Sequence, residues 1–198
     1  MIDYSKYTQS YLARGIWEKW HSKTWEDYVS PEGHDIVTPV RDLVETETKA
    51  TVLLYGKNGT GKTMLMNIAM KELLHRGKSV VVLDFRDLVS LYTASIWRHE
   101  GRLLELLDYD YVGIDDLGKE FSSSDMSREL VCTVIDYVIR YRNARQKSTW
   151  ITFNLLLKEV AMTYNEHIAS LFKRDAVAIG FDGVDFGDNQ LNIIKTKK

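Results

Sequence analysis

The chain has 198 residues, long enough for one compact α/β core with a modest extension and too short for two full domains. Hydrophobic residues make up 44% and charged residues 27% of it, the composition of a globular protein and not of a disordered one. No apolar run approaches the ~20 residues of a membrane span, and the N-terminus lacks an apolar signal core. We therefore expect a cytoplasmic protein.

Cysteine content and charge exclude two further classes. Cys132 is the single cysteine, which rules out an intrachain disulfide and a cysteine-rich zinc site. The net charge of -2 lacks the basic excess of a typical nucleic-acid-binding protein, so any DNA contact must be local. Two basic clusters are candidates for such contact, and a solvated helix end or tail is the plainer interpretation of each. They comprise Arg140, Arg142, Arg145 and Lys147, and the C-terminal Lys195, Lys197 and Lys198.

Residues 1–45 form an aromatic-rich N-terminal extension, which we treat as a unit separate from residues 46–198. Its rings are Tyr4, Tyr7, Tyr11, Trp17, Trp20, Trp25 and Tyr28. A chain turn is expected at residues 30–33. The rings either pack the extension onto the core or form a partner-binding surface, since tryptophan and tyrosine are common in both settings. The sequence leaves both interpretations open.

Five apolar runs after residue 50 predict buried strands, at residues 51–55, 79–85, 111–115, 149–153 and 177–181. Helical patterns lie between them. The clearest are residues 65–73 ending near Gly77, residues 130–139 with Ser124 or Asp125 as N-cap, and residues 155–173. This alternation predicts one parallel, doubly wound sheet of five strands with helices on both faces.

A complete P-loop pattern, G-x-x-x-x-G-K-[ST], follows the first strand and opens the first helix, as the pattern requires. It consists of Gly56, Lys57, Asn58, Gly59, Thr60, Gly61, Lys62 and Thr63. Its glycines let consecutive N–H groups and the helix N-terminus face phosphate oxygens. Lys62 is expected to neutralise these oxygens, and the Thr63 hydroxyl to ligate Mg²⁺. ATP and Mg²⁺ are therefore the predicted ligands.

Two adjacent carboxylates, Asp115 and Asp116, end the strand that begins at Tyr111, where ligands bind in open α/β sheets. In this Walker B pattern Asp115 would hold the magnesium ion, and Asp116 would orient or deprotonate the attacking water. Asn154 ends the strand 149–153, where a polar residue in additional-strand ATPases reaches the γ-phosphate region. It is our sensor candidate, and capping of the following helix is the alternative.

With these blocks assembled, the chain resembles the DnaC/IstB-like branch of the AAA+ ATPases, which includes bacterial and phage helicase loaders and certain transposition ATPases. The blocks that carry the resemblance are LYGKNGTGKT at 54–63, IDDLG at 114–118, VIRYRN at 138–143 and TWITFN at 149–154. The IDDLG block discriminates most, because most other AAA+ branches carry Asp-Glu there. The resemblance covers about residues 48–186.

The resemblance implies a P-loop NTPase of the AAA+ additional-strand (ASCE) type. Such a protein uses ATP binding and hydrolysis as an assembly switch on a replicative helicase or on single-stranded DNA. It also implies an ATP-dependent homo-oligomer whose neighbouring subunit supplies an arginine. The family's Ser-Arg-Leu block here reads Ser170 and Leu171, so Arg174 is a displaced candidate for this arginine. The block that ends Asp-Phe-Arg in the family reads Asp-Phe-Gly at 185–187.

Two other departures concern architecture. Loaders of this family carry a separate helicase-binding domain, which residues 1–45 are too short to form, so the aromatic extension either grips the helicase itself or serves another partner. The chain leaves no room for a C-terminal helical lid after the fifth strand, and no lid arginine is expected. This compact architecture suits a phage or mobile-element protein.

The leading hypothesis is an ATP-dependent DNA replication protein of the helicase-loader type, with slow or partner-stimulated ATP hydrolysis. An IstB-like DNA transposition ATPase and a slow nucleotide-binding adaptor of a replication protein are the alternatives. A small-molecule kinase is disfavoured by the IDDLG block. A DNA contact, if present, would involve the rings and arginines of residues 86–102, although these also fit an ordinary amphipathic helix.

Overall fold

The computed structural model describes residues 7–30, 34–98, 101–118 and 127–181. Its centre is one sheet of five parallel strands in the order β2-β3-β4-β1-β5. The strands are β1 (Thr51–Tyr55), β2 (Val80–Asp84), β3 (Tyr111–Leu117), β4 (Ser148–Phe153) and β5 (Ala176–Gly180). This confirms the predicted sheet. Because the strands are parallel and β1, β4 and β3 are neighbours, the loops that follow these three strands lie together at the carboxyl end of the sheet.

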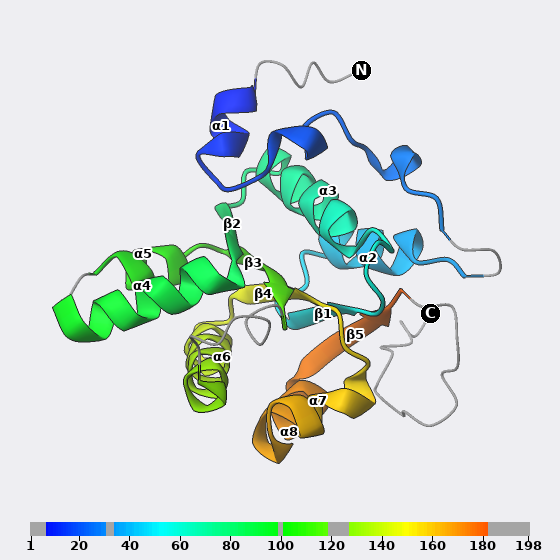
Figure 1. Cartoon of the computed structure of the whole chain (residues 1–198). Coiled ribbons are helices and arrows are strands. Elements are labelled where there is room, and N and C mark those ends of the chain that lie inside the picture. The colour runs from blue at the N-terminus through cyan, green and yellow to red at the C-terminus, as the bar shows by residue number, and fades with distance from the viewer. Residues whose placement is uncertain (1–6, 31–33, 99–100, 119–126, 182–198) are drawn as a thin grey trace.

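Helices cover both faces of the sheet, as Figure 1 shows. α2 (Val37–Glu45) and α3 (Lys62–His75) pack on one face. The other face carries α4 (Phe85–Arg98), α5 (Arg102–Leu107), α6 (Arg128–Asn143), α7 (Val160–Thr163) and α8 (Glu166–Asp175). None of the helices that the structure describes has the length and apolar character to cross a bilayer. Among the residues that the structure describes, Phe181 follows β5 and no helical lid is present.

Two helices differ in detail from the expectation. α6 begins at Arg128, and its N-cap is Ser127, whose side chain accepts a hydrogen bond from the Leu130 N–H at 3.2 Å. The proposed caps at positions 124 and 125 lie outside the described residues. The stretch expected as one helix over 155–173 is split into the 3₁₀ turn η5 (Leu157–Glu159), α7 and α8. The split occurs because Asn165 caps a new helix, accepting from the Ile168 N–H at 2.8 Å.

The N-terminal segment, residues 7–30, contains α1 (Thr8–Leu12), η2 (Glu18–Trp20) and η3 (Trp25–Asp27) and runs over α3 in Figure 1. Tyr11 and Ile16 are fully buried in the same core as α3. The N–H of Val82 in edge strand β2 donates to the Arg14 carbonyl at 2.8 Å. Gly15 follows with a φ of +72°, and a Cβ there would lie 2.0 Å from the Val82 carbonyl oxygen. The segment thus covers the sheet edge, which would otherwise expose unpaired backbone groups.

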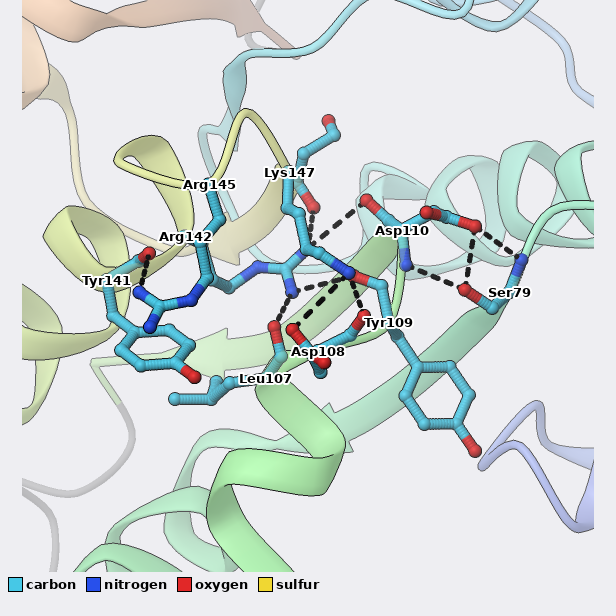
Figure 2. Close-up of polar contacts among 10 residues, drawn as sticks. Ser79, Leu107, Asp108, Tyr109, Asp110, Tyr141, Arg142, Arg145 and Lys147 are labelled. Carbon is cyan, nitrogen blue, oxygen red and sulfur yellow. Dashed lines mark hydrogen bonds and ion pairs between the residues drawn. The ribbon is translucent and has the colours of Figure 1, made fainter.

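The basic turn, residues 140–147 at the end of α6, was a candidate for DNA contact with a solvated helix end as the plainer interpretation, and its Arg142 fits neither. Arg142 is fully buried, and Figure 2 shows its guanidinium among the backbone of the turn that precedes β3. It donates to the carbonyls of Leu107 at 2.5 Å, Tyr109 at 2.9 Å and Asp110 at 3.3 Å. It also donates to the Ser148 carbonyl and to the Thr149 hydroxyl at the start of β4. Burial lowers the pKa of Arg142 to about 10.

Its basic neighbours are also engaged within the chain. Arg140 pairs with Asp136 at 2.6 Å, and Lys147 donates to the Asp108 carbonyl. The guanidinium of Arg145 lies 3.7 Å from the ring centroid of Tyr141. The turn lies at the amino ends of β3 and β4, and the predicted site lies at the opposite, carboxyl end of the sheet. The basic tail at 195–198 is outside the described residues.

Candidate functional site

The P-loop connects β1 to α3 and depends on glycine geometry. Gly56, Gly59 and Gly61 have φ values of 132°, 78° and 88°, a region that side chains with a Cβ rarely adopt. Gly61 is the N-cap of α3 and provides no side-chain acceptor for the first N–H groups of the helix. These donors, together with the positive end of the helix dipole, form the expected anion-binding feature.

Lys62 is the first residue of α3 and is only 6% exposed. Its Nζ donates to the Gly56 carbonyl at 2.7 Å and to the Lys57 carbonyl at 2.5 Å. A third contact, at 3.3 Å, goes to the Thr60 hydroxyl. The loop therefore holds the ammonium group with neutral acceptors, and the negatively charged oxygens of a phosphate are stronger partners for the same group.

The P-loop is joined directly to the Walker B strand. The Thr63 hydroxyl donates to Asp115 Oδ1 at 2.8 Å, and the Thr152 hydroxyl donates to the same oxygen at 2.5 Å. Neighbouring ligands of an octahedral Mg²⁺, at 2.0–2.1 Å from the ion, are about 2.9 Å apart, so the Thr63–Asp115 spacing fits a shared magnesium ion. No group of three or more His, Cys, Asp or Glu side chains suited to a metal occurs among the described residues.

Asp116 has a left-handed backbone, with a φ of +62°. The β3–β4 pairing is irregular between Ile114 and Leu117, and the Asp116 N–H donates to the Thr152 hydroxyl at 2.9 Å. Such strain in a non-glycine residue is stored where the surrounding structure requires it, often at functional sites. Here it places two consecutive carboxylates at the same pocket.

A pocket of about 390 Å³ brings these residues together. It is lined by Asn58, Gly59, Thr60, Gly61, Lys62, Thr63 and Met64 from the P-loop side, by Asp115, Asp116 and Asn154 from the strand ends, and by Trp17, Lys19 and Trp20. Gly56 and Lys57 contact the pocket through Lys62. A wider groove of about 1020 Å³ lies between Tyr92, α6 and Tyr164, and it includes neither the P-loop nor the two aspartates.

Arg174 is not among the residues that line the P-loop pocket. It lies in the last turn of α8 and is exposed. A role at the pocket of its own subunit is therefore not supported by its position. A role toward a neighbouring subunit stays a prediction.

The described rings and arginines of residues 86–102 have separate environments. Arg86 pairs with Asp84 at 3.3 Å, and the Tyr92 ring packs against Tyr137 with centroids 5.3 Å apart. Trp97 is 79% exposed near the end of α4. The plainer interpretation, an amphipathic helix, accounts for most of this segment.

The structure adds site residues that sequence reasoning missed. Thr152 bridges both aspartates, and its only sequence signal is its place two residues before Asn154 on a strand that neighbours β3. Tyr28 donates from its hydroxyl to the Thr60 carbonyl at 2.9 Å. A Cβ on Gly61 would lie 2.6 Å from the Tyr28 ring, so Gly61 also permits this close packing. Burial raises the pKa of Tyr28 to about 12, which keeps its hydroxyl protonated as a donor.

Comparison with known proteins agrees with this geometry. Residues 21–171 match the family described as IstB-like ATP binding protein. The chain belongs to this family. The match includes the P-loop, both aspartates and Asn154, and it begins within the N-terminal segment.

Among curated relatives, the replicative helicase loader DnaC of Buchnera aphidicola is 26% identical over 163 residues, 78% of this chain and 64% of that protein. DnaC of Escherichia coli K12 is 27% identical over 123 residues, 60% of this chain and 48% of that protein. The chain thus spans about half to two-thirds of the length of these relatives. This IstB-like family member also shares its fold with solved replication proteins.

A crystal structure of the DnaC helicase loader superposes with a TM-score of 0.70 at 21% identity, covering 83% of this chain and 99% of that one. The replication initiator DnaA bound to AMPPCP and single-stranded DNA gives 0.65 at 20% identity, covering 83% and 50%. DnaI gives 0.66 at 18% identity, covering 82% and 92%. At these identities the structures establish a shared fold.

Proposed function

We propose that this chain binds ATP and Mg²⁺ in the P-loop pocket, hydrolyses the nucleotide, and uses the cycle as an assembly switch in DNA replication. The observation that carries the proposal is the hydrogen-bonded connection from Thr63 through Asp115 and Thr152 to Asp116. It links the phosphate-binding loop to the carboxylate of Asp115 and to the backbone N–H of Asp116, and both aspartates line one pocket. Membership of an ATP-binding family and the resemblance to DnaC support the same direction.

Each residue has a distinct role in this proposal. The P-loop N–H groups and Lys62 bind the β- and γ-phosphates, and Thr63 and Asp115 hold the magnesium ion. When bound there, the ion would neutralise charge that develops on the transferred phosphoryl group. Asp116 orients the attacking water and accepts its proton, and Asn154 contacts the γ-phosphate. Thr152 is a positioning residue, because it fixes both aspartates without reaching the nucleotide.

The proposed partner is a replicative helicase, in line with the DnaC relatives, and single-stranded DNA is the proposed second ligand. We further propose an ATP-dependent homo-oligomer in which Arg174 acts on the nucleotide of the neighbouring subunit. Its exposed position at the end of α8 is compatible with such a contact. An arginine supplied in trans is worth roughly 10³ to 10⁵ in rate in well-studied NTPases.

The test combines light scattering with steady-state ATP hydrolysis, with and without a hexameric replicative helicase and single-stranded DNA. We expect an ATP-dependent complex with the helicase and turnover that rises with protein concentration. Arg174→Ala is expected to remove that rise, whereas Lys173→Ala, the exposed neighbour on the same helix, keeps it. A chain that stays monomeric, ignores the helicase and is indifferent to Arg174→Ala contradicts the loader proposal.

The family match also favours a second candidate, a DNA transposition ATPase of the IstB kind. Such a protein is expected to assemble on duplex DNA in the presence of ATP, without a helicase. ATP-dependent co-sedimentation with long duplex DNA, combined with no helicase complex, would select this alternative. Binding of nucleotide without stimulation by any DNA would instead indicate a slow adaptor.

A further inference from the structure

The N-terminal segment forms one wall of the P-loop pocket, a role that its aromatic composition did not indicate. Trp17, Lys19 and Trp20 line the pocket together with Lys62, Asp116 and Asn154. Lys19 is exposed, and its Nζ lies 5.0 Å from the Trp17 ring centroid and 4.7 Å from that of Trp20. These cation–π contacts hold a positive charge at the mouth of the pocket.

This wall is anchored at several points, so its position beside the pocket follows from the fold. The Lys71 ammonium of α3 donates to the His21 carbonyl at 2.9 Å and to the Lys23 carbonyl. His21 Nε2 is 2.8 Å from the Ile16 carbonyl, a buried hydrogen bond within the segment. Upstream, the Arg14 carbonyl pairs with β2. The backbone that carries Lys19 is therefore fixed beside the pocket, and the Lys19 side chain extends from that fixed position.

Charge complementarity indicates what Lys19 is positioned to bind. Among the described residues that line the pocket, Lys62 and Lys19 are the cations, and Asp115 and Asp116 are the anions. A nucleoside triphosphate with one Mg²⁺ leaves a net negative charge, which adds to that of the two carboxylates. Lys62 alone offsets only part of this sum, and Lys19 is the other cation lining the pocket that reduces it further.

The position of Lys19 relative to the strands indicates which phosphate it faces. The segment approaches from β2, which lies beside β3 in the sheet, so it reaches the pocket from the side of Asp115 and Asp116. Tyr28 contacts the P-loop at Gly61 and Thr60 and stacks edge-on against Phe181, which follows β5. Lys19 thus lines the pocket together with Asp116 and Asn154, the residues that the proposed function assigns to the terminal phosphate.

We propose that Lys19 binds the γ-phosphate of ATP within its own subunit, so that the N-terminal segment distinguishes ATP from ADP. The inference rests on the proposed ATP site and adds a residue to it. ATP draws the ammonium group from the faces of Trp17 and Trp20 toward the terminal phosphate. ADP lacks that phosphate and leaves the ammonium group over the rings. The state of the nucleotide is thereby transmitted to the surface formed by residues 17–20, of which Trp17 is 58% exposed.

The test measures the affinities of the full chain for ATP and ADP, with Mg²⁺, for wild type and Lys19→Gln. We expect Lys19→Gln to weaken ATP binding roughly tenfold, the size of a charge-assisted contact, and to leave ADP binding within about twofold. Lys19→Arg keeps the preference for ATP. The matched control is Lys23→Gln, because Lys23 lies on the same segment, pairs with Asp27 at 3.4 Å and does not line the pocket.

Tryptophan fluorescence provides a second readout. In the wild type ATP changes the emission and ADP does not, and Lys19→Gln removes the difference. Equal effects of Lys19→Gln on both nucleotides, or on neither, overturn the role of Lys19 while the ATP site stands. A wild type that binds neither nucleotide overturns the proposed function itself, and the two failures are thus distinguishable.

Discussion

The basic turn after α6 and the N-terminal segment use their charged residues in opposite ways. In the basic turn, Arg142 is buried, and its N–H groups donate to backbone carbonyls just before β3 and at the start of β4. In the N-terminal segment, Lys19 rests on two aromatic rings at the mouth of a pocket. The difference teaches that a cluster of basic residues in a sequence does not identify a binding surface. What matters is whether the fold has already supplied acceptors for the charge.

Removing the buried cation is expected to have the largest effect on stability. Arg142→Met removes a donor from four carbonyls, of which that of Asp110 also accepts from the Ser148 N–H, so we expect the free energy of unfolding to fall by about 3 kcal/mol or more. Arg145→Met is the control, because the Arg145 guanidinium lies over the Tyr141 ring and donates to one carbonyl, and its cost should stay within ~0.5 kcal/mol. Urea titration of both variants measures the difference. Equal, small losses of unfolding free energy in both variants would contradict a buried Arg142 and would leave it available for contact with DNA.

The next largest effect on stability is expected where the N-terminal segment attaches to β2. Gly15→Ala forces a Cβ to within 2.0 Å of the Val82 carbonyl oxygen at a positive φ, and we expect a loss of about 2–4 kcal/mol. Gly77→Ala has a similar φ of +80° but meets no atom within 4 Å, so it isolates the backbone strain, about 1–2 kcal/mol. Thermal unfolding of the two variants gives the steric part as a difference. If Gly15→Ala is no worse than Gly77→Ala, the segment does not pair with β2.

A smaller, pH-dependent effect on stability is expected for Lys71, which joins the N-terminal segment to α3. Burial lowers the pKa of Lys71 to about 8 from its ordinary value of 10.5. Between these values the folded protein binds fewer protons than the unfolded chain, so this group makes stability rise with pH. We expect the wild type to gain stability relative to Lys71→Met from pH 8 to 10, by less than the ~1.4 kcal/mol per pH unit of a full proton. A flat or falling difference would show that the Lys71 ammonium keeps its proton in the folded state.

Much of the fold was predictable from the sequence, because the strands are apolar runs with distinct glycine and polar boundaries. β1 was predicted to the residue, and the P-loop pattern correctly predicted the start of α3. The break before α8 was missed, since Asn165 reads as an ordinary polar position until its capping hydrogen bond is known. Local sequence patterns thus predict the presence of strands and helices well, and they predict breaks within a helical stretch less well.

The candidate site divides in the same way. Consecutive residues such as 56–63 and 115–116 form recognisable patterns, because neighbouring positions must act together. Thr152, Lys19 and Tyr28 reach the site from segments that are distant in sequence. Their contribution depends on strand register and on the path of the N-terminal segment, neither of which a single sequence reveals. The burial of Arg142 was hidden for the same reason.

The most direct test of the central claim is steady-state ATP hydrolysis by Asp116→Asn, together with its affinity for ATP. Asparagine accepts the left-handed backbone at this position, where φ is +62°, so the variant should fold. We predict ATP affinity within about threefold of the wild type and a turnover at least ~100-fold lower, the effect of losing a general base. An unchanged turnover would contradict the assignment of this pocket as the ATPase site.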